Sequence, residues 1–470
     1  MSGRHLVVVG GGPAGLAAAV AGHRAGVDVT VIEERPGLGG NFHHGRLPEP
    51  DREGSPAWFE RHGTGVRRMV GTAVVDSRSP GELTVSNPDG RSEVSFDTLV
   101  IATGAHDRGV PIPGWTLPGV FTAGGALTMA KAHHVRPGRR VVVAGSGPFL
   151  LPVADAVSRL GARVSVLEAT ALESSVRGGW TVARDRHLAA ETVGYAVRLA
   201  RRGVRYRHQR AITRIDGDDR VREVVHARVD AEWRPMAGTE RREAVDAVAI
   251  GFGFTAATEL AQLLGCALRY DDAQRGYVVG ADGLQRTSVA GVFAAGEATG
   301  FGGERVARVE GRLAGLAAAH TLGRLSTSDF ESESRRALVE LARPRRAARW
   351  LATAFRPRDG LWSGLGRDDT ICRCEDVRLG QLVDALADNL VDPRAAKAGT
   401  RAGMGLCQGR ICSGAITEIL RVSHGYMPPA GERPWTIHPP LRPVPIGEWA
   451  AATPRSRVMT DVGREPAVAL

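Results

Sequence analysis

The stretch that decides the fold is HLVVVGGGPAGLAAAVAGHRAGVDVTVIEE, residues 5–34. Its first five residues are apolar apart from His5, which is typical of a short buried strand. The alanine-rich segment after the glycines predicts a helix, and VDVTVIEE predicts a second strand. The chain therefore contains a strand–helix–strand unit, the building block of a parallel sheet.

Glycines at the turn of this unit have the spacing of a dinucleotide site. Gly10, Gly12 and Gly15 stand in the pattern G-x-G-x-x-G between the predicted strand and helix. The first glycine allows a tight turn, the second lets a pyrophosphate approach the backbone, and the third lets the helix pack on the strand. Glu33 ends the second strand, where a carboxylate can accept hydrogen bonds from ribose hydroxyls. We predict a bound dinucleotide with its phosphates at the helix N-terminus; the alternative is a fold that has lost its ligand.

A second unit of the same kind starts with RRVVVAGSG at residue 139. Gly145 and Gly147 preserve the turn and the phosphate approach, but Leu150 stands where the third glycine would be. Glu168, at the end of the following strand, would suit an unphosphorylated ribose, and therefore NAD rather than NADP. Because the close helix packing is lost, we expect this unit to serve as a scaffold, with NAD binding as the alternative.

Four of the five cysteines lie close together in the sequence. Cys372 and Cys374 form C-x-C in ICRCEDV, and Cys407 and Cys412 form C-x-x-x-x-C in KAGTRAGMGLCQGRIC. Four thiolates are the ligand set of a [2Fe–2S] cluster. The alternatives are structural zinc, although zinc pairs usually have about two to four intervening residues, and incidental thiols with no metal. The fifth cysteine, Cys266, is predicted to be an ordinary core residue.

Basic residues surround these cysteines in the sequence. They are Arg373, Lys397, Arg401 and Arg410. Because a cluster with four thiolates is anionic, such cations would stabilise it and raise its reduction potential. The alternative is that they only solvate the ends of loops.

The formal net charge of +10 comes from arginine, because Lys131 and Lys397 are the only lysines among 61 basic residues. A nucleic-acid-binding protein concentrates Lys and Arg on one face, whereas here arginines are scattered among 51 acids. No apolar run approaches the ~20 residues of a membrane span. We therefore expect a cytoplasmic protein with no membrane span and no nucleic-acid partner. The compact ammonium of lysine suggests that the two lysines occupy tight pockets.

Two further motifs make the chain resemble flavoproteins with two dinucleotide-binding domains. They are ATGA at 102–105 and AAGEATG at 294–300. The resemblance implies an α/β fold with Rossmann-like sheets of the glutathione or thioredoxin reductase type, and FAD in the first site. Because NFHHGR after Gly40 departs from the usual run, another adenine nucleotide is the alternative ligand. The cofactor-binding residues implied are Gly10, Gly12, Pro13, Ala14, Gly15, Glu33, Gly40, Thr103, Gly104, Gly296 and Glu297.

Over nearly the whole length, the chain resembles the large subunits of heteromeric amino-acid dehydrogenases. These are the opine oxidase A subunits, the D-hydroxyproline dehydrogenase alpha subunits and the hydrogen cyanide synthase B subunit. The cysteine segment resembles bacterioferritin-associated ferredoxin. The similarity lies in PIPGWTLPGVFTAGGALTMAK, GSGPFLLPVA, GEATGFGGERVARVEGRLAG, the two cysteine motifs and RPWTIHPPLRPVPIGEW.

This resemblance implies that an amino acid or its derivative is oxidised on the flavin of a D-amino-acid-oxidase-type partner subunit. The present chain would pass the electrons onward through the cluster and FAD, and a small ferredoxin-like subunit would be a further partner. The alternatives are a self-contained NAD(P)H-dependent reductase of a ferredoxin-like acceptor and a non-enzymatic iron–sulfur sensor. The resemblance carries over no catalytic residue to this chain, and the substrate would be selected in the partner.

The expected domains follow from these motifs. Residues 326–369 are polar and rich in arginine, which favours a helical connection, and seven prolines between 428 and 445 favour an extended arm. The expected boundaries are 1–110 with 286–325 for the FAD-binding domain, 111–285 for the NAD(P)-binding-like domain, 326–369 for the connection, 370–425 for the [2Fe–2S] domain and 426–470 for the arm.

Overall fold

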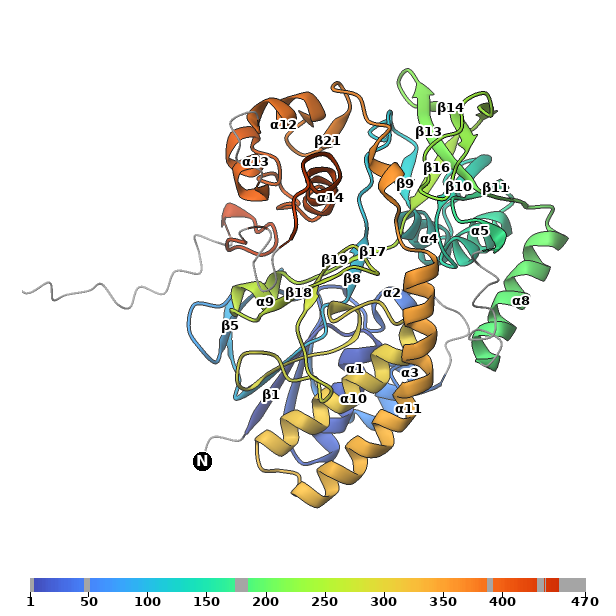
Figure 1. Cartoon of the computed structure of the whole chain (residues 1–470). Helices are drawn as coiled ribbons and strands as arrows, with labels where there is room; N and C mark the ends of the chain where they lie inside the picture. Colours follow the sequence, from blue (N-terminus) through green and yellow to red (C-terminus); the bar gives the residue numbers. More distant parts are fainter. Residues whose placement is uncertain are drawn as a thin grey trace, which may run out of the picture.

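The structure is a computed structural model, and it describes residues 4–45, 51–173, 185–386, 392–428, 435 and 437–447. Figure 1 shows its three bodies: a lobe around β1, a second lobe around β10, and a helical module with α12, α13 and α14. The α/β fold class predicted from the sequence is confirmed. Among the described helices, none has the length and apolarity needed to cross a bilayer.

The first lobe is built on a parallel sheet in the order β20-β7-β1-β2-β3. β1 and β2 pair along their whole length, so they end together at the glycine turn. Leu6, Val7 and Val8 are fully buried, which explains why the run is continuously apolar. Pro13 opens α1, where its fixed φ is already helical. The bounds are β1 His5–Val9, α1 Pro13–Arg24, β2 Asp28–Ile32, β3 Arg67–Met69, β7 Thr98–Ile101 and β20 Val292–Ala294.

An antiparallel meander, the sheet β4-β5-β6, lies between β3 and β7 in the sequence. It follows two short helices that come after β2. The bounds are α2 Gly40–His43, α3 Pro56–His62, β4 Ala73–Asp76, β5 Glu82–Asn87 and β6 Gly90–Ser95.

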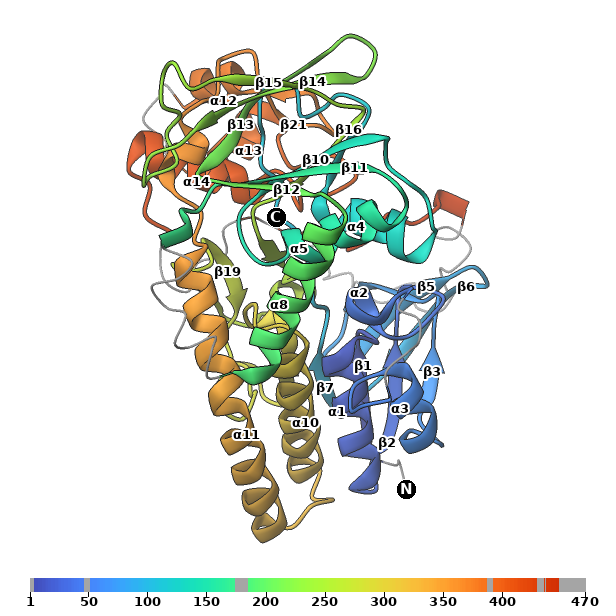
Figure 2. The same cartoon turned by 90° about the vertical axis from the view of Figure 1, so that its right-hand side faces the viewer.

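Two long helices complete the first lobe. A Cβ on Gly311 of α10 would lie 1.9 Å from the carbonyl oxygen of Ala14, so α10 packs almost backbone to backbone on α1. α11 follows the outer side of α10 and continues to the second lobe, as Figure 2 shows. Ser326 caps α11 by accepting the N–H of Asp329. The bounds are η1 Gly296–Ala298, α10 Glu304–Thr321 and α11 Thr327–Ala354.

The second lobe repeats the parallel arrangement in the order β12-β11-β10-β16-β9. An antiparallel sheet, β13-β14-β15, packs beside it. The expected second strand–helix–strand unit is present, although its helix begins later after the glycine turn than in the first lobe. The bounds are β9 Val120–Thr122, α4 Ala123–Ala132, β10 Arg140–Gly145, α5 Leu150–Arg159, β11 Arg163–Glu168, α8 Arg186–Arg201, β12 Arg205–His208, β13 Arg210–Gly217, β14 Val221–Arg228, β15 Arg241–Ala244 and β16 Ala247–Gly251.

The chain crosses between the lobes on two antiparallel strands, β8 and β17. β8 begins at Ala105, the last residue of the ATGA motif, so the crossing begins at the wall of the first glycine turn. A hairpin, β18 with β19, and the short helix α9 follow β17. The bounds are β8 Ala105–Asp107, β17 Phe254–Ala256, α9 Glu259–Leu263, β18 Leu268–Asp271 and β19 Gly276–Val279.

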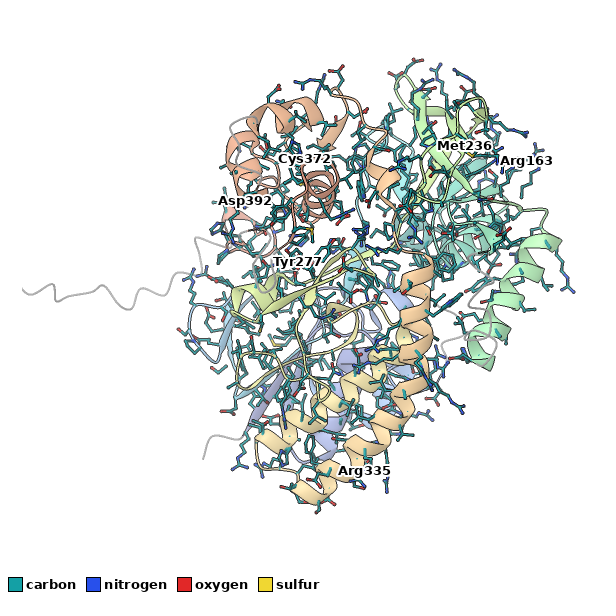
Figure 3. The ribbon with its side chains drawn as sticks, viewed as in Figure 1. Arg163, Met236, Tyr277, Arg335, Cys372 and Asp392 are labelled. Atoms are coloured by element: carbon teal, nitrogen blue, oxygen red, sulfur yellow. The ribbon has the colours of Figure 1, made fainter. Side chains whose placement is uncertain are left out.

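The C-terminal module is small and helical. Ile371, Leu382 and Ile416 are fully buried in a core that continues into the second lobe. The indole N–H of Trp115 in that lobe donates to the carbonyl of Thr370 at 2.6 Å. Figure 3 shows Cys372 within this module. The bounds are η2 Asp359–Trp362, β21 Thr370–Cys372, β22 Val377–Arg378, α12 Leu379–Ala385, α13 Pro393–Thr400 and α14 Ser413–His424.

Most of the expected arm, 426–470, lies outside the described residues. The part at 437–445 has no regular secondary structure and returns to the first lobe. There Leu441 is buried, and its N–H donates to the carbonyl of Val75 at 2.7 Å. The domain boundaries given above remain a proposal.

Candidate functional site

A cavity of about 2100 Å³ opens at the carboxyl end of β1, where the sequence predicts the dinucleotide. It extends along the crossing strands to the second lobe. The structure brings the separated motifs together there, and every predicted residue of this site lines the cavity except Gly15. The lining residues among them are Gly10, Gly12, Pro13, Ala14, Glu33, Gly40, Thr103, Gly104, Gly296 and Glu297.

The three glycines of the turn serve different steric purposes. Gly10 has φ +111°, and a Cβ there would lie 2.2 Å from the carbonyl oxygen of Ala102. A Cβ on Gly15 would lie 1.8 Å from the carbonyl oxygen of Gly10, so α1 packs directly on the turn. A Cβ on Gly12 would meet nothing closer than the Cα of Gly40, at 3.8 Å. Gly12 therefore leaves space for a ligand, which fits a pyrophosphate at the N-terminus of α1.

Glu33 holds the glycine turn as well as lining the cavity. Its carboxylate accepts the N–H of Gly11 at 2.7 Å and the N–H of Arg35 at 2.9 Å. Each carboxylate oxygen has a further lone pair. A ribose contact of Glu33 remains a prediction, and it is compatible with this geometry.

Glu297 lies in η1, which also lines the cavity, and its side chain is half-buried. Burial, and secondly the charge of Glu310, raises the pKa of Glu297 to about 7. Burial also raises the pKa of Glu310. A carboxyl that holds its proton near neutral pH can donate a hydrogen bond to a ligand.

Glu310 and Arg345 hold the η1 turn in place. One oxygen of Glu310 accepts the N–H of Gly296 at 3.0 Å, and the other accepts an N–H of Arg345 at 2.8 Å. Arg345 comes from α11, so the connecting helix supports the wall of the cavity. Sequence reasoning missed both residues, although Glu310 lies within the quoted motif GEATGFGGERVARVEGRLAG.

Glu297 makes the stability of the FAD-free protein depend on pH. Its pKa is about 7 when folded and 4.5 when exposed, so the folded protein binds more protons between these values. The contribution to the free energy of unfolding is complete below pH 4.5 and is lost as the pH rises to about 7. The loss amounts to roughly 3 kcal/mol at about 1.36 kcal/mol per pH unit.

We expect Glu297→Gln to remove this dependence. Urea unfolding of the FAD-free protein at pH 5 and pH 8 measures it. The native protein should lose more stability between these two pH values than the variant, by roughly 3 kcal/mol. Equal losses in both proteins would contradict the prediction.

A second cavity, of about 250 Å³, is lined by all four predicted cysteines. The thiols meet in two pairs, Cys372 with Cys412 and Cys374 with Cys407. The hydrogen bond from Cys412 lowers the pKa of Cys372 to about 5, and the same bond raises the pKa of Cys412. Within the described residues, no three cysteine, histidine or acidic side chains are placed to hold one metal ion. Two thiolates for each of two irons is the arrangement of a [2Fe–2S] cluster, which these pairs fit.

The two thiol pairs differ in exposure. Cys372 and Cys412 are buried, whereas Cys407 is half-buried and Cys374 is exposed. A Cβ on Gly405 would lie 2.2 Å from the Cβ of Cys374, so only glycine lets this loop pass so close. One edge of the cluster site therefore faces the molecular surface.

The four predicted cations do not all face the cysteines. The charges of Lys397 and Arg410 interact with Cys412 and Cys407, respectively. Arg373 lies over the ring of Trp115 and lines the cavity of the four cysteines. By contrast, Arg401 pairs with Glu375 at 3.0 Å and is exposed. The expectation that these cations surround the cluster is thus supported for three of the four.

Lys397 is half-buried, and burial lowers its pKa. Because reduction adds a negative charge to the cluster, Lys397→Gln should lower its midpoint potential by roughly 60 mV, a tenfold change for one electron. Lys397→Arg keeps the positive charge but replaces the compact ammonium with a wider guanidinium, so we expect a smaller shift of the midpoint potential. A redox titration followed by paramagnetic resonance measures both.

Arg401→Gln is the matched control, because it removes an exposed charge that water screens. We expect its potential to stay near the native value. Native potentials in both Lys397 variants would exclude a role for this lysine in tuning the cluster.

The two cavities share a thin wall. The Nε2 atom of His106, in β8, is 2.9 Å from the carbonyl oxygen of Arg410, which lies between the last two cluster cysteines. A Cβ on Gly109 would lie 2.3 Å from the carbonyl oxygen of Ile411. The segment after β8 therefore packs in close backbone contact with the cysteine loop, residues 407–412. His106 and Arg410 both line the large cavity. Sequence reasoning missed His106, which no motif marks.

The arm fastens the cysteine loop from the other side. The side chain of Gln408 donates to the carbonyl of Pro440 at 2.6 Å, and Arg410 donates to that of Leu441 at 2.5 Å. Arg410 also pairs with Glu259 of α9 at 2.9 Å. The loop that carries two cluster ligands is therefore held to the first lobe.

The remaining lysine, Lys131, lies at the cavity as well. Its Nζ donates to the carbonyl oxygen of Phe42 at 2.6 Å. Phe42 belongs to the NFHHGR run and lies in α2, so Lys131 links α4 of the second lobe to α2 of the first. At the second glycine turn Gly147 lines the cavity, but Leu150 and Glu168 do not.

Comparisons with known proteins agree with this architecture. Residues 4–323 match the pyridine nucleotide-disulphide oxidoreductase family, and residues 370–421 match the BFD-like [2Fe-2S] binding domain. The chain is 30% identical to the opine oxidase A subunit of Agrobacterium tumefaciens (strain Ach5), over 98% of this chain and 94% of that protein. It is 33% identical to the HcnB subunit of the hydrogen cyanide synthase of Pseudomonas aeruginosa, over 94% and 97%. The crystal structure of L-proline dehydrogenase from P. horikoshii has the same fold, with a TM-score of 0.65, 21% identity, and coverage of 95% of this chain and 80% of that one.

Proposed function

The chain belongs to the pyridine nucleotide-disulphide oxidoreductases that carry a BFD-like [2Fe-2S] domain, with the opine oxidase A and HcnB subunits, and we propose that it is the electron-transfer subunit of a heteromeric dehydrogenase. In this proposal the substrate is an amino acid or amino-acid derivative, of the opine, D-hydroxyproline, proline or glycine class. It is oxidised at a CH–NH or CH–NH2 bond on the flavin of a D-amino-acid-oxidase-type partner subunit. Both relatives are named as subunits of enzymes, which supports a heteromeric assembly.

FAD and a [2Fe–2S] cluster are the cofactors of these two domains, and the residues present fit both. The open space at Gly12 and the proton-holding Glu297 would receive FAD, and the two thiol pairs would receive the cluster. When bound, the flavin supplies one- and two-electron chemistry and the cluster supplies one-electron chemistry.

The observation that carries the proposal is the thin wall between the two cavities. His106 and the Arg410 backbone join them through one hydrogen bond, and the arm keeps the cysteine loop in place. These residues hold two redox sites in adjacent positions, as electron transfer requires. No step of amine oxidation is assigned to a side chain of this subunit.

The outer edge of the cluster site supports a partner that delivers electrons there. Cys374 is exposed, and beside Cys407 the side chain of Leu406 is 79% exposed. Met404, two residues before Leu406, is 43% exposed, and neighbouring exposed apolar side chains of this kind mark places where another protein docks. The predicted cluster ligand Cys374 is thus exposed on the same side of the cluster site as Leu406.

The experiment is affinity purification of the tagged chain from its own cells under anaerobic conditions. We expect a second flavoprotein of the D-amino-acid-oxidase type to co-purify. The complex is then mixed with octopine, nopaline, D-hydroxyproline, L-proline or glycine. One of these should produce the paramagnetic signal of the reduced cluster in the complex and leave the isolated chain unchanged.

The main alternative is a self-contained NAD(P)H-dependent reductase. Rapid bleaching of the flavin in the isolated chain by NADH would favour it. Purification of the native chain without any flavin, together with no turnover in the complex, would favour the iron–sulfur sensor instead.

A further inference from the structure

The second glycine turn is covered by an aromatic ring from the connecting helix. A Cβ on Gly147 would lie 3.6 Å from the Cγ of Phe355, the residue that ends α11. At the equivalent Gly12, a Cβ would meet only the Cα of Gly40, at 3.8 Å. The second glycine of this pattern is where a pyrophosphate approaches the backbone. Phe355 occupies that approach in the second lobe, whereas the approach in the first lobe is open.

The backbone N–H groups at the second turn are already engaged. α1 begins at Pro13, directly after Gly12, whereas α5 begins only at Leu150. The N–H of Leu150 donates to the carbonyl of Gly147 at 3.1 Å, and the N–H of Leu151 donates to that of Pro148 at 3.1 Å. A phosphate needs free N–H groups at a helix N-terminus, and these two are used within the turn.

Glu168, the acid that would bind the ribose of a nucleotide, is also out of reach of a ligand in the cavity. Glu168 is only 1% exposed and does not line the cavity, unlike Glu33. Its carboxylate accepts the N–H groups of Gly147 and Thr170, both at 2.9 Å, and the hydroxyl of Tyr206 at 3.4 Å. The hydroxyl of Tyr206 thus engages the carboxylate that would otherwise accept hydrogen bonds from the ribose of NAD.

Further aromatic side chains surround the blocked turn. Phe149 and Phe254 pack edge to face with ring centroids 4.9 Å apart, and Phe254 packs in the same way on Phe301. Trp350, one turn earlier on α11, contacts the edge of Phe355. Phe149, Phe254, Phe301 and Phe355 all line the large cavity, as Gly147 does.

We propose that the second dinucleotide fold excludes pyridine nucleotides and that Phe355 is the residue that excludes them. The family to which the chain belongs implies such a nucleotide, and the residues at this turn do not fit it. Electrons would then enter this chain by way of the cysteine module and not from NAD(P)H. The exclusion rests on the second glycine turn and on Phe355 alone, so it holds whether or not the electron-transfer proposal is right.

The test measures NADH and NAD binding to the full-length chain loaded with its cofactors. Titration calorimetry and the quenching of tryptophan fluorescence by NADH report binding without turnover. The native chain should show no binding up to about 1 mM, the upper end of ordinary substrate affinities. Phe355→Ala should bind at least about tenfold more tightly than the native chain, or about 1.4 kcal/mol.

Trp350→Ala is the matched control, because it removes a ring from the same helix without opening Gly147. It should bind no NADH. If Phe355→Ala fails to fold, Phe355→Leu preserves apolar contact and still removes the ring. NADH binding by the native chain with a dissociation constant below about 1 mM would overturn the proposal, as would a folded Phe355 variant with no gain in affinity. Neither result bears on the substrate-dependent signal of the complex, which tests the proposed function separately.

Discussion

Replacing Cys407 with serine is expected to abolish the [2Fe–2S] cluster. Cys407 pairs with Cys374, so the substitution leaves one iron with a single thiolate. The visible absorption and the paramagnetic resonance signal of the cluster should disappear. Electron transfer from the partner to an external acceptor should fall at least about 100-fold, which corresponds to about 2.7 kcal/mol in activation free energy.

Cys266→Ser is the matched control. Cys266 is 2% exposed in the core of the first lobe, where its thiol donates to the hydroxyl of Thr287. The control should keep the full cluster spectrum, although its stability falls slightly. An unchanged spectrum in Cys407→Ser would show that these cysteines do not hold an iron–sulfur cluster.

Replacing Gly12 with valine is expected to remove FAD from a folded protein. The backbone at Gly12 is extended, with φ −80° and ψ −177°, so a side chain is tolerated there. A Cβ would meet no protein atom closer than 3.8 Å, and it would occupy the space of the pyrophosphate. We expect FAD affinity to fall at least about 100-fold, or about 2.7 kcal/mol, measured by flavin fluorescence on reconstitution.

Gly37→Val controls for a change in the same region of the chain. Gly37 is exposed in the loop after β2, and a Cβ there would meet nothing within 4 Å. This variant should bind FAD like the native chain. Native FAD affinity in Gly12→Val would place the ligand somewhere other than the first glycine turn.

The sequence predicts the sheets and the two glycine turns because their signals are local. A strand buried on both faces needs a continuous apolar run such as the LVVV of β1. Position 10 needs glycine because the carbonyl oxygen of Ala102 leaves no room for a Cβ. The four cysteines were found in the same way, because ligand type and spacing define the site. Their division into two pairs could not be predicted, since it depends on how the loops fold.

The residues that sequence reasoning missed act across long distances in the chain. Arg345 supports Gly296 only because α11 packs on α10, and His106 reaches Arg410 across 304 positions. Phe355 covers Gly147 because α11 extends from one lobe to the other. A helical pattern predicts that a segment is a helix, but it does not predict where the helix ends in space.

The central claim is that electrons reach the cysteine module from an amine substrate through a partner. The direct measurement is anaerobic paramagnetic resonance of the cluster in the purified complex, after addition of octopine, nopaline, D-hydroxyproline, L-proline or glycine, and in the isolated chain after addition of NADH. We predict a reduced-cluster signal in the complex with one of these substrates, and none in the isolated chain with NADH. Reduction of the isolated chain by NADH within seconds, with no response of the complex to any of the substrates, would contradict this claim.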